Sequence, residues 1–293
     1  MKSLRLLAFL SGLLCSSVFS VAAPQATSGN PDLDLGVQAY KNARYGEAIL
    51  RFKQAVDLDP TLLNARLYLA TAYAQQYVPG VDTPENGRFA EQAIEQYKAV
   101  LERNPKNVDS VKGIAYLDLQ MKQFEKAKEF YHKAIEIDPK DPEPYFSVAV
   151  IDWTQTYQAR MELRAKLDLK QLQPLIRSAE CWHLRDPNRE LVDDGIVMLQ
   201  KAIELRRDYD DAMAYMNLMY RERADIQCGD AKAYAADLKT ADGWVDLTIG
   251  TKKRKSENSP VSPLNFNKDA HPAGGQRRTV ICGGSLETPV PQE

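Results

Sequence analysis

The chain has 293 residues, of which 44% are hydrophobic and 27% are charged, and its formal net charge is -2. These values are ordinary for a folded protein with a substantial core. A nearly balanced charge without a concentrated basic face gives no indication of a nucleic-acid partner.

The first residues have the pattern of an export signal. Lys2 and Arg5 give a positive start, and residues 6–21 are uncharged and largely apolar. We predict a signal peptide over residues 1–22, cleaved after the small residue Ala22. The alternative is an uncleaved membrane anchor, but the apolar run is shorter than the ~20 residues that a membrane-spanning helix needs.

Cleavage would leave a mature protein without a membrane span, in the periplasm or the extracellular space. Cys15 lies in the apolar run, but Leu14 before it is not the small residue of a lipoprotein signal, so lipid attachment is not predicted. Residues 23–30 are small and polar, and we predict a disordered leader there.

The strongest pattern is a repeated order of small, aromatic, small and proline residues. Its three copies are Ala48, Phe52, Ala55 and Pro60; Ala93, Tyr97, Val100 and Pro105; and Ala127, Tyr131, Ala134 and Pro139. The last two copies are 34 residues apart, and the first two are 45 apart, which corresponds to one period with an insertion. Such a period is typical of helical hairpins that stack into a solenoid.

Each hairpin needs small residues where its two helices touch, because only Gly or Ala lets the helix axes approach closely. The predicted contact positions are Gly36, Ala70, Ala115 and Ala149 on first helices, and Ala48, Ala93, Ala127 and Gly195 on second helices. Bulky residues are expected in the core beside them: Leu35, Leu69, Ile114, Val148, Phe52, Tyr97, Tyr131 and Leu199.

The sequence therefore predicts an all-α fold, a right-handed superhelix over residues 31–252. The repeats are expected near residues 29–62, 63–107, 108–141, 142–209 (with an insertion) and 210–250. The last helix should end near Gly250 and expose charged residues, Asp237 among them, as a polar end cap. Residues 253–293 are rich in Pro, Gly, Ser and Asn and are predicted to be a disordered tail.

The fourth repeat contains 34 surplus residues, around positions 154–190. A degenerate extra repeat would place Met161, Ala165, Asp168 and Gln173 at the signature positions. Asp and Gln fit those positions badly, so an insertion is favoured: a longer first helix, then an irregular stretch at Ala179–Asn188. The acidic pairs Asp193–Asp194 and Asp210–Asp211 are expected at helix starts, where carboxylates favour the positive end of the helix dipole.

Three cysteines remain after cleavage: Cys181, Cys228 and Cys282. They allow one internal disulfide and one free thiol, or three unpaired cysteines, and their spacing does not decide the pairing. His183 beside Cys181 gives too few ligands for a structural zinc site, which usually takes four. We predict no metal and no cofactor.

The segments 210–225 and 233–245, together with the divided fourth repeat, resemble exported bacterial tetratricopeptide repeat (TPR) proteins. The resemblance covers roughly residues 30–252. It implies an all-helical superhelix in the periplasm, a protein-binding role and no catalytic residues. The branch of this family that grips a peptide C-terminus uses several basic residues on its first helices. Here Lys112 is the only basic residue among the corresponding positions, so that mode is not predicted.

The inner face of the first helices is predicted to form a partner-binding groove lined by Val37, Tyr68, Lys112, Tyr116, Leu119, Phe146, Val150, Trp153, Tyr215 and Leu218. Aromatic and aliphatic residues of this kind would anchor an apolar segment of a protein or peptide partner. The alternative is that the insertion folds back and covers these residues as ordinary core.

We therefore expect a non-enzymatic protein-interaction scaffold of the bacterial cell envelope. The alternative function is an accessory protein that binds an envelope glycan or surface polymer, because aromatic residues also stack on sugar rings. The sequence contains no Gly-rich phosphate loop, no His-Glu-x-x-His pair and no Gly-x-Ser-x-Gly turn, so no enzyme is predicted. It does not indicate an oligomeric state.

Overall fold

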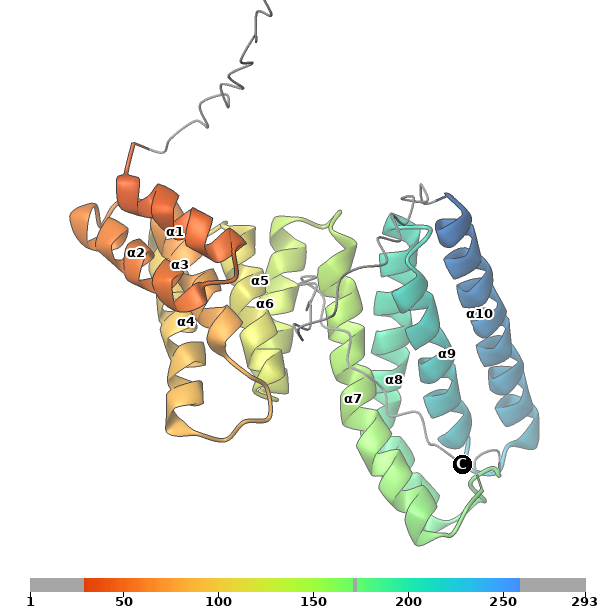
Figure 1. Cartoon of the computed structure of the whole chain (residues 1–293). Helices are drawn as coiled ribbons and strands as arrows, with labels where there is room; N and C mark the ends of the chain where they lie inside the picture. The colour runs from red at the N-terminus through yellow and green to blue at the C-terminus, as the bar shows by residue number, and fades with distance from the viewer. Residues whose placement is uncertain (1–28, 171–172, 259–293) are drawn as a thin grey trace, which may run out of the picture.

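The computed structural model describes residues 29–170 and 173–258, which form ten helices and no strand (Figure 1). The helices are α1 (Pro31–Lys41), α2 (Tyr45–Leu58), α3 (Leu63–Gln76), α4 (Pro84–Arg103), α5 (Val108–Gln120), α6 (Phe124–Ile137), α7 (Pro142–Lys166), α8 (Ala179–Leu205), α9 (Asp210–Asp225) and α10 (Ala231–Asn258). The predicted signal peptide and almost all of the predicted leader and tail lie outside the described residues.

Consecutive helices form five hairpins that stack in chain order. Each odd-numbered helix packs against the even-numbered helix that follows it, and each even-numbered helix packs against the next hairpin. Figure 1 shows the resulting row, with α1–α6 on one side and α7–α10 on the other. The predicted all-α solenoid is confirmed.

Local signals in the sequence explain where several helices begin. The side chains of Asn30, Thr83, Asn107, Asp141 and Ser178 each accept a hydrogen bond from a backbone N–H in the first turn of α1, α4, α5, α7 and α8. Such caps satisfy backbone donors that have no partner inside the helix. Proline follows the cap in α1, α4 and α7, where its fixed φ suits the first turn.

All eight predicted small contact residues are buried. A Cβ atom added at Gly36 would lie 2.5 Å from the ring of Phe52, and one added at Gly195 would lie 1.8 Å from Cε of Met219. Gly113, which the sequence analysis did not single out, has the same relation to Tyr97, at 2.5 Å. At Gly36 and Gly113 an aromatic ring of a neighbouring helix occupies the space of the missing Cβ, whereas at Gly195 the end of the flexible Met219 side chain occupies it.

Leu35 is the exception among the predicted core residues, because 43% of its surface is exposed. Leu69 and Ile114, at the corresponding places in later repeats, are buried. These two helices have a preceding hairpin to pack against, whereas no described hairpin precedes α1. Leu33, on the side of α1 that faces the rest of the stack, is buried instead.

The insertion between the first two repeats lies in the second hairpin. Helix α4 has 20 residues, against 14 in α2 and α6, and residues 77–83 connect it to α3. The buried side chain of Asn86 holds this connection: its amide nitrogen donates to the carbonyls of Val78 and Val81, and its oxygen accepts from the backbone N–H of Val78.

The surplus residues of the fourth repeat extend a hairpin and do not form another one. Helices α7 and α8 have 25 and 27 residues, against 13 and 14 in α5 and α6. The expectation of an irregular stretch at Ala179–Asn188 is wrong, because these residues form the first turns of α8, capped by Ser178 and continuing through Pro187. Asp193 and Asp194 therefore lie inside a helix, not at its start, whereas Asp210 and Asp211 do begin α9.

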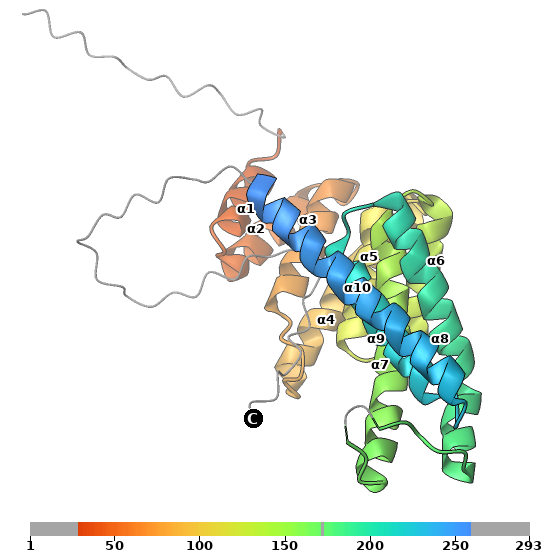
Figure 2. The same cartoon turned by 90° about the vertical axis from the view of Figure 1, so that its right-hand side faces the viewer.

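The last helix is longer than predicted. Helix α10 continues past Gly250 to Asn258, so residues 253–258, assigned to the disordered tail, are helical. One glycine inside a helix costs only about 1 kcal/mol, and packing along α9 offsets it. Figure 2 shows α10 crossing this end of the stack. Asp237, expected to be exposed, is buried and lies 2.6 Å from Arg223 of α9.

The core runs through the whole stack in three clusters of buried residues. One cluster lies within α1–α5, another within α7–α9, and a smaller one joins α5, α6 and α7 through Ala115, Tyr131, Val148 and Ile151. None of the described helices combines the length and apolar character needed to cross a membrane.

The close contact at Gly36 gives a direct test of the packing. Gly36→Ala should lower the free energy of unfolding by about 1–3 kcal/mol, because the buried Phe52 ring must move. The measurement is urea unfolding followed by circular dichroism. Gly87→Ala in α4 is the matched control: no atom lies within 4 Å of its added Cβ, so stability should stay the same or rise by up to about 1 kcal/mol. Equal effects of the two changes would contradict this account of the packing.

Candidate partner-binding face

The predicted groove residues lie on α1, α3, α5, α7 and α9, the first helices of the five hairpins. We call the surface that they form the first-helix face. Tyr68 of α3 and Tyr116 of α5 are 40% and 38% exposed, whereas Val150 of α7 is buried. The other seven predicted residues are half-buried. The face is thus open over α3 and α5 and more closely packed over α7 and α9.

Over α7 and α9 the aromatic side chains pack on one another. The ring of Tyr215 meets Phe146 and Trp153 edge to face, with centroids 5.4 Å apart in both pairs. Burial raises the pKa of Tyr215 to about 12. This region has the character of a core, as the alternative in the sequence analysis held, but α9 provides the cover and not the insertion.

Tyr116 stays exposed because the next first helix does not cover it. Helix α7 packs closely against α9, and it meets α5 through the ion pairs of Lys112 and through the buried cluster that Ala115 shares with α7. These contacts leave Tyr116 exposed. Leu119, one turn further along α5, packs against the cluster that joins α5, α6 and α7. Tyr68 stacks on the ring of Phe52 at 5.5 Å and still keeps much of its surface in solvent.

The remaining members of the predicted set lie at the two ends of the first-helix face. Val37 packs against the core of α1–α5, and Leu218 is half-buried on α9.

Lys112 is engaged by two acidic residues of the next repeat. Its Nζ donates to Oδ2 of Asp141 at 2.9 Å and also to Glu143, both at the start of α7. Burial lowers the pKa of Lys112, but the hydrogen bonds to Glu143 and Asp141 outweigh burial and leave that pKa raised. Its charge is therefore already compensated within the chain.

A buried ion network joins α7 to α9, and the sequence analysis missed it. Arg160 lies 2.8 Å from Glu222 and 2.9 Å from Asp225, and Arg164 donates to both oxygens of Asp225 at 2.9 Å. Burial raises the pKa of Glu222 to about 7. The signal in the sequence was spacing: two arginines four residues apart and two acids three residues apart each share one helix face.

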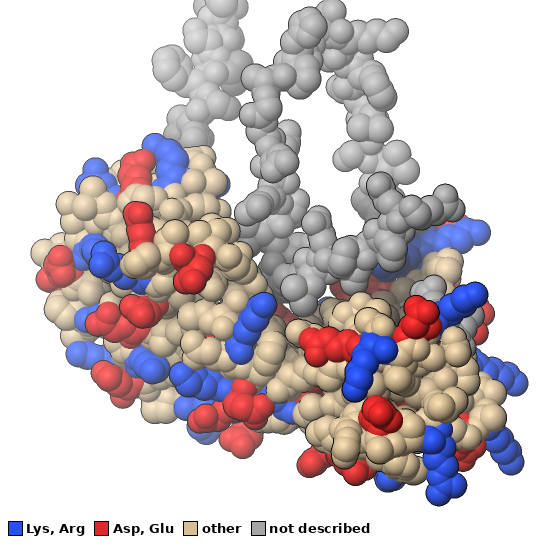
Figure 3. Space-filling view, turned by 90° about the horizontal axis from the view of Figure 1, so that it is seen from below, with Lys and Arg blue, Asp and Glu red and all other residues tan. Residues whose placement is uncertain are grey.

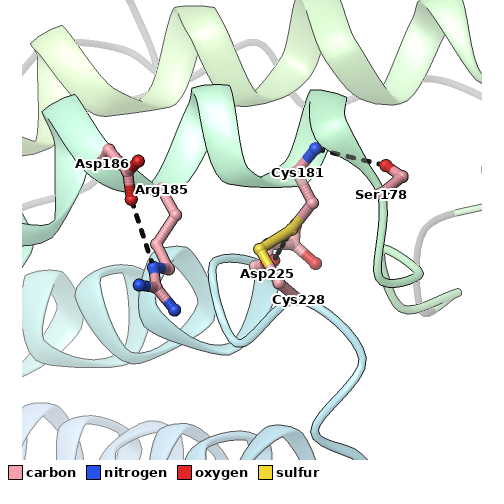
Figure 4. Close-up of a disulfide and its surroundings, with 6 residues drawn as sticks. All are labelled: Ser178, Cys181, Arg185, Asp186, Asp225 and Cys228. Carbon is pink, nitrogen blue, oxygen red and sulfur yellow. Dashed lines mark hydrogen bonds and ion pairs between the residues drawn. A yellow bond between two sulfur atoms is a disulfide. The ribbon is translucent and has the colours of Figure 1, made fainter.

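A disulfide beside this network joins the start of α8 to the segment that follows α9. Cys181, in the first turn of α8, is bonded to Cys228, which follows α9 (Figure 4). The pairing that the spacing left open is therefore Cys181 with Cys228, while Cys282 lies outside the described residues. As a disulfide partner, Cys181 is not available to join His183 as a metal ligand. The described ranges contain no cluster of three or more side chains suited to a metal ion.

A second buried acidic group lies between the third and fourth hairpins. Asp152 of α7 is fully buried and accepts a hydrogen bond from Lys128 of α6 at 2.7 Å, and Asp194 of α8 lies 3.9 Å from the same lysine. Burial raises the pKa of Asp152 to about 7, against the lowering effect of Lys128.

Two shallow hollows occur away from the first-helix face. One, of about 450 Å³, lies between α2, α3 and α4, and the other, of about 740 Å³, lies between α6 and α8. Both are lined mainly by charged and polar side chains. The face seen in Figure 3 likewise has acidic and basic side chains interspersed, without a large area of one sign.

Comparison with known proteins supports the repeat assignment. Residues 86–148 match the model of the tetratricopeptide repeat family. The crystal structure of MamA protein is 12% identical, with 78% of this chain and 93% of that chain covered and a TM-score of 0.52. A MamA RS-1 double mutant is 14% identical, with 78% of this chain and 96% of that chain covered and a TM-score of 0.53.

The segment of MamA from residue 41 to its end, from Desulfovibrio magneticus RS-1, is 13% identical. It covers 76% of this chain and 94% of that one, with a TM-score of 0.52. The fold is that of a TPR solenoid. At these identities the likeness concerns the fold alone, and no curated protein matches the sequence.

The buried Asp152 predicts a pH-dependent stability. Its carboxyl ionises near pH 3.8 when unfolded but near 7 in the folded chain, so folding stability falls as pH rises from about 4 to about 7 and then levels off. Asp152→Asn removes this dependence. Between about pH 4 and pH 7 the unaltered protein should therefore lose up to about 4 kcal/mol of unfolding free energy relative to the variant. Urea unfolding at a series of pH values measures it, and parallel profiles would contradict the shift.

The disulfide predicts a stabilising contribution that is lost on reduction. Cys181→Ala combined with Cys228→Ala should lower the free energy of unfolding by about 2–4 kcal/mol, because the cross-link closes a long loop in the unfolded chain. Reductant should destabilise the unaltered protein by a similar amount in urea unfolding. The double variant is the control, and an equal effect of reductant on it would show that the bond does not act in this way.

Proposed function

We propose that this protein is a non-enzymatic scaffold that binds a segment of another protein on its first-helix face and is exported to the bacterial cell envelope. The observation that carries the proposal is the exposure of Tyr116 and Tyr68 on two successive first helices. The large rings of the second helices, Phe52, Tyr97 and Tyr131, are all buried.

Exposed tyrosines on one face of a repeat array suit a protein partner. A tyrosine ring contributes a large apolar area, loses little conformational entropy on binding, and has a hydroxyl that can hydrogen-bond a peptide backbone. Tyr68 and Tyr116 lie near the middle of the stack, so a partner centred on them could also contact the helices on either side. An extended or helical segment would fit such an elongated face.

The two carboxyls whose pKa is raised to about 7 do not favour an enzyme. Asp152 and Glu222 are buried between helices and paired with Lys128 and Arg160. A general acid or base must reach a substrate, and these carboxyls do not face either hollow or the first-helix face. Their environment fits structural ion pairs.

Two features favour export. Residues 1–22 have the composition of a cleaved signal peptide. The disulfide between Cys181 and Cys228 fits an oxidising compartment, where such bonds form and persist.

The glycan alternative has less support from the aromatic geometry. Sugar rings stack on the flat faces of exposed aromatic side chains. Over α7 and α9 the rings of Phe146, Trp153 and Tyr215 meet edge to face and cover part of one another. The face of Tyr68 is partly covered by its stacking on Phe52.

Photo-crosslinking in the native envelope tests the proposal. A photoreactive p-benzoylphenylalanine in place of Tyr116 or Tyr68 should form covalent adducts with a discrete protein partner, because both positions would lie in the interface. The same residue in place of Leu58, which is 72% exposed on α2, is the control and should give none. Mass spectrometry of the adducts identifies the partner.

Tyr116→Ala should weaken capture of that partner by about 5- to 30-fold, the usual cost of removing an aromatic anchor. Leu50→Ala is the control, because Leu50 is 55% exposed but lies on α2, a second helix away from the first-helix face. Equal labelling at position 58, or retention on envelope polysaccharide without a protein adduct, would contradict the proposal.

A further inference from the structure

Two carboxylates face one ammonium group where α5 meets the start of α7. Asp141 and Glu143 share the single ammonium group of Lys112. The second oxygen of Asp141 accepts from the backbone N–H of Glu143 as a helix cap, which leaves its charge in place. All three side chains are between 21% and 27% exposed, so these groups carry a formal charge of -1 at a solvent-accessible position, part of which the positive end of the α7 dipole offsets.

Aromatic rings border this group on both helices. Tyr116 follows Lys112 by one turn of α5, and Phe146 follows Glu143 by three residues of α7, so each ring lies on the same helix side as its charged neighbour. Exposed Tyr116 and half-buried Phe146 thus flank the charged group.

The negative potential of these carboxylates extends to the buried tyrosines behind them. Burial is the main cause of the raised pKa of Tyr131 and Tyr209, and the charge of Glu143 raises both further. Asp141 and Asp211 add to the effect on Tyr209. The guanidinium of Arg206 lies 4.2 Å from the ring centroid of Tyr209 and acts in the opposite direction, lowering the pKa of Tyr209.

We propose that the segment bound on the first-helix face carries a Lys or Arg beside an apolar residue, and that the basic side chain docks between Tyr116 and Glu143. This rests on the proposed function and specifies its partner. The ring face attracts the cation, and the surplus carboxylate charge pairs with it. The adjacent apolar residue contacts the aromatic side chains over α7.

An acidic or neutral segment would fit less well. An acidic side chain would approach two carboxylates, and it could reach Lys112 only by displacing them. A neutral side chain of the same shape would gain packing but no ion pair. Charge at one position of the ligand should therefore control the affinity.

The test uses fluorescein-labelled peptides Ser-Gly-Leu-X-Leu-Gly-Ser, with X as arginine, its neutral analogue citrulline, or glutamate. Fluorescence anisotropy measures their binding to the mature chain. The arginine peptide should bind about tenfold more tightly than the citrulline peptide, and the glutamate peptide should bind most weakly. Equal affinities, or no saturable binding of the arginine peptide up to about 1 mM, would overturn the proposal.

Two variants should change the affinity in opposite directions. Glu143→Gln removes the surplus charge and should weaken binding of the arginine peptide about 5- to 10-fold. Lys112→Met removes the competing cation and should strengthen it about 3- to 10-fold. A merely structural role for the group would weaken binding in both variants, and that result would contradict the proposal.

Matched controls come from elsewhere in the chain. Lys128→Met also removes a lysine that pairs with carboxylates, but between α6, α7 and α8, so the arginine peptide should bind unchanged. Glu136→Gln removes an exposed carboxylate of α6 with the same expected result. Circular dichroism checks the fold of each variant, and Lys112→Gln replaces Lys112→Met if that variant does not fold.

A chain ending at Asn258 distinguishes an external partner from an internal one. Residues Arg277–Ile281 also combine basic and apolar side chains. Equal affinity of the shortened and full mature chains supports an external partner. A tenfold gain on shortening would mean that the chain's own segment occupies the face, which would overturn the proposal. Adducts at position 116 with segments that lack a basic residue would leave the scaffold function standing and refute this inference alone.

Discussion

The stack depends on one steric condition: at each close helix contact, a residue without a large side chain faces a ring or a long side chain from the neighbouring helix. Gly36 with Phe52 and Gly113 with Tyr97 meet it with no room for an additional Cβ, and at Gly195 the end of the Met219 side chain fills the space. Burial of these large side chains supplies the main stabilising free energy, and the absence of a Cβ lets the axes come close enough to achieve it. Because each hairpin meets only its neighbours, an insertion can lengthen one hairpin without disturbing the others.

The fourth hairpin shows how such an extension is stabilised. The longer ends of α7 and α8 project beyond the neighbouring hairpins (Figure 1). There they are joined to α9 by the ion network of Arg160 and Arg164 with Glu222 and Asp225, and by the Cys181–Cys228 disulfide. Neither joint relies on the small-residue contacts of the regular repeats. Removing one member of the network would leave a buried charge without compensation, so its members depend on one another.

The sequence predicted the regular part of the fold because the same physical signal recurs in several repeats. Small residues, buried rings and terminating prolines agreed in phase, and the helices lie where that phase puts them. The errors occur where one copy of a pattern has a different environment. Leu35 has no preceding hairpin to bury it, Ser178 caps a helix that continues through Pro187, and α9 supports α10 beyond Gly250. Of the site, the sequence placed the residues on the first helices. It did not show that α9 would cover Phe146 and Trp153, because that requires the relative position of two helices.

The same relative positions explain why the first-helix face is most exposed over α3 and α5. Where α7 and α9 approach each other, the aromatic side chains pack against one another, so little of their surface is exposed. Over α5, Tyr116 stays 38% exposed, and the ion pairs of Lys112 with Asp141 and Glu143 join α5 to the start of α7. An exposed ring beside two carboxylates and one ammonium group suits the ligand proposed above. Such a ligand would be stabilised by burying the apolar ring and by pairing its positive charge with a carboxylate. The spacing between successive first helices, set by the small-residue contacts behind them, thus determines which part of the face stays exposed.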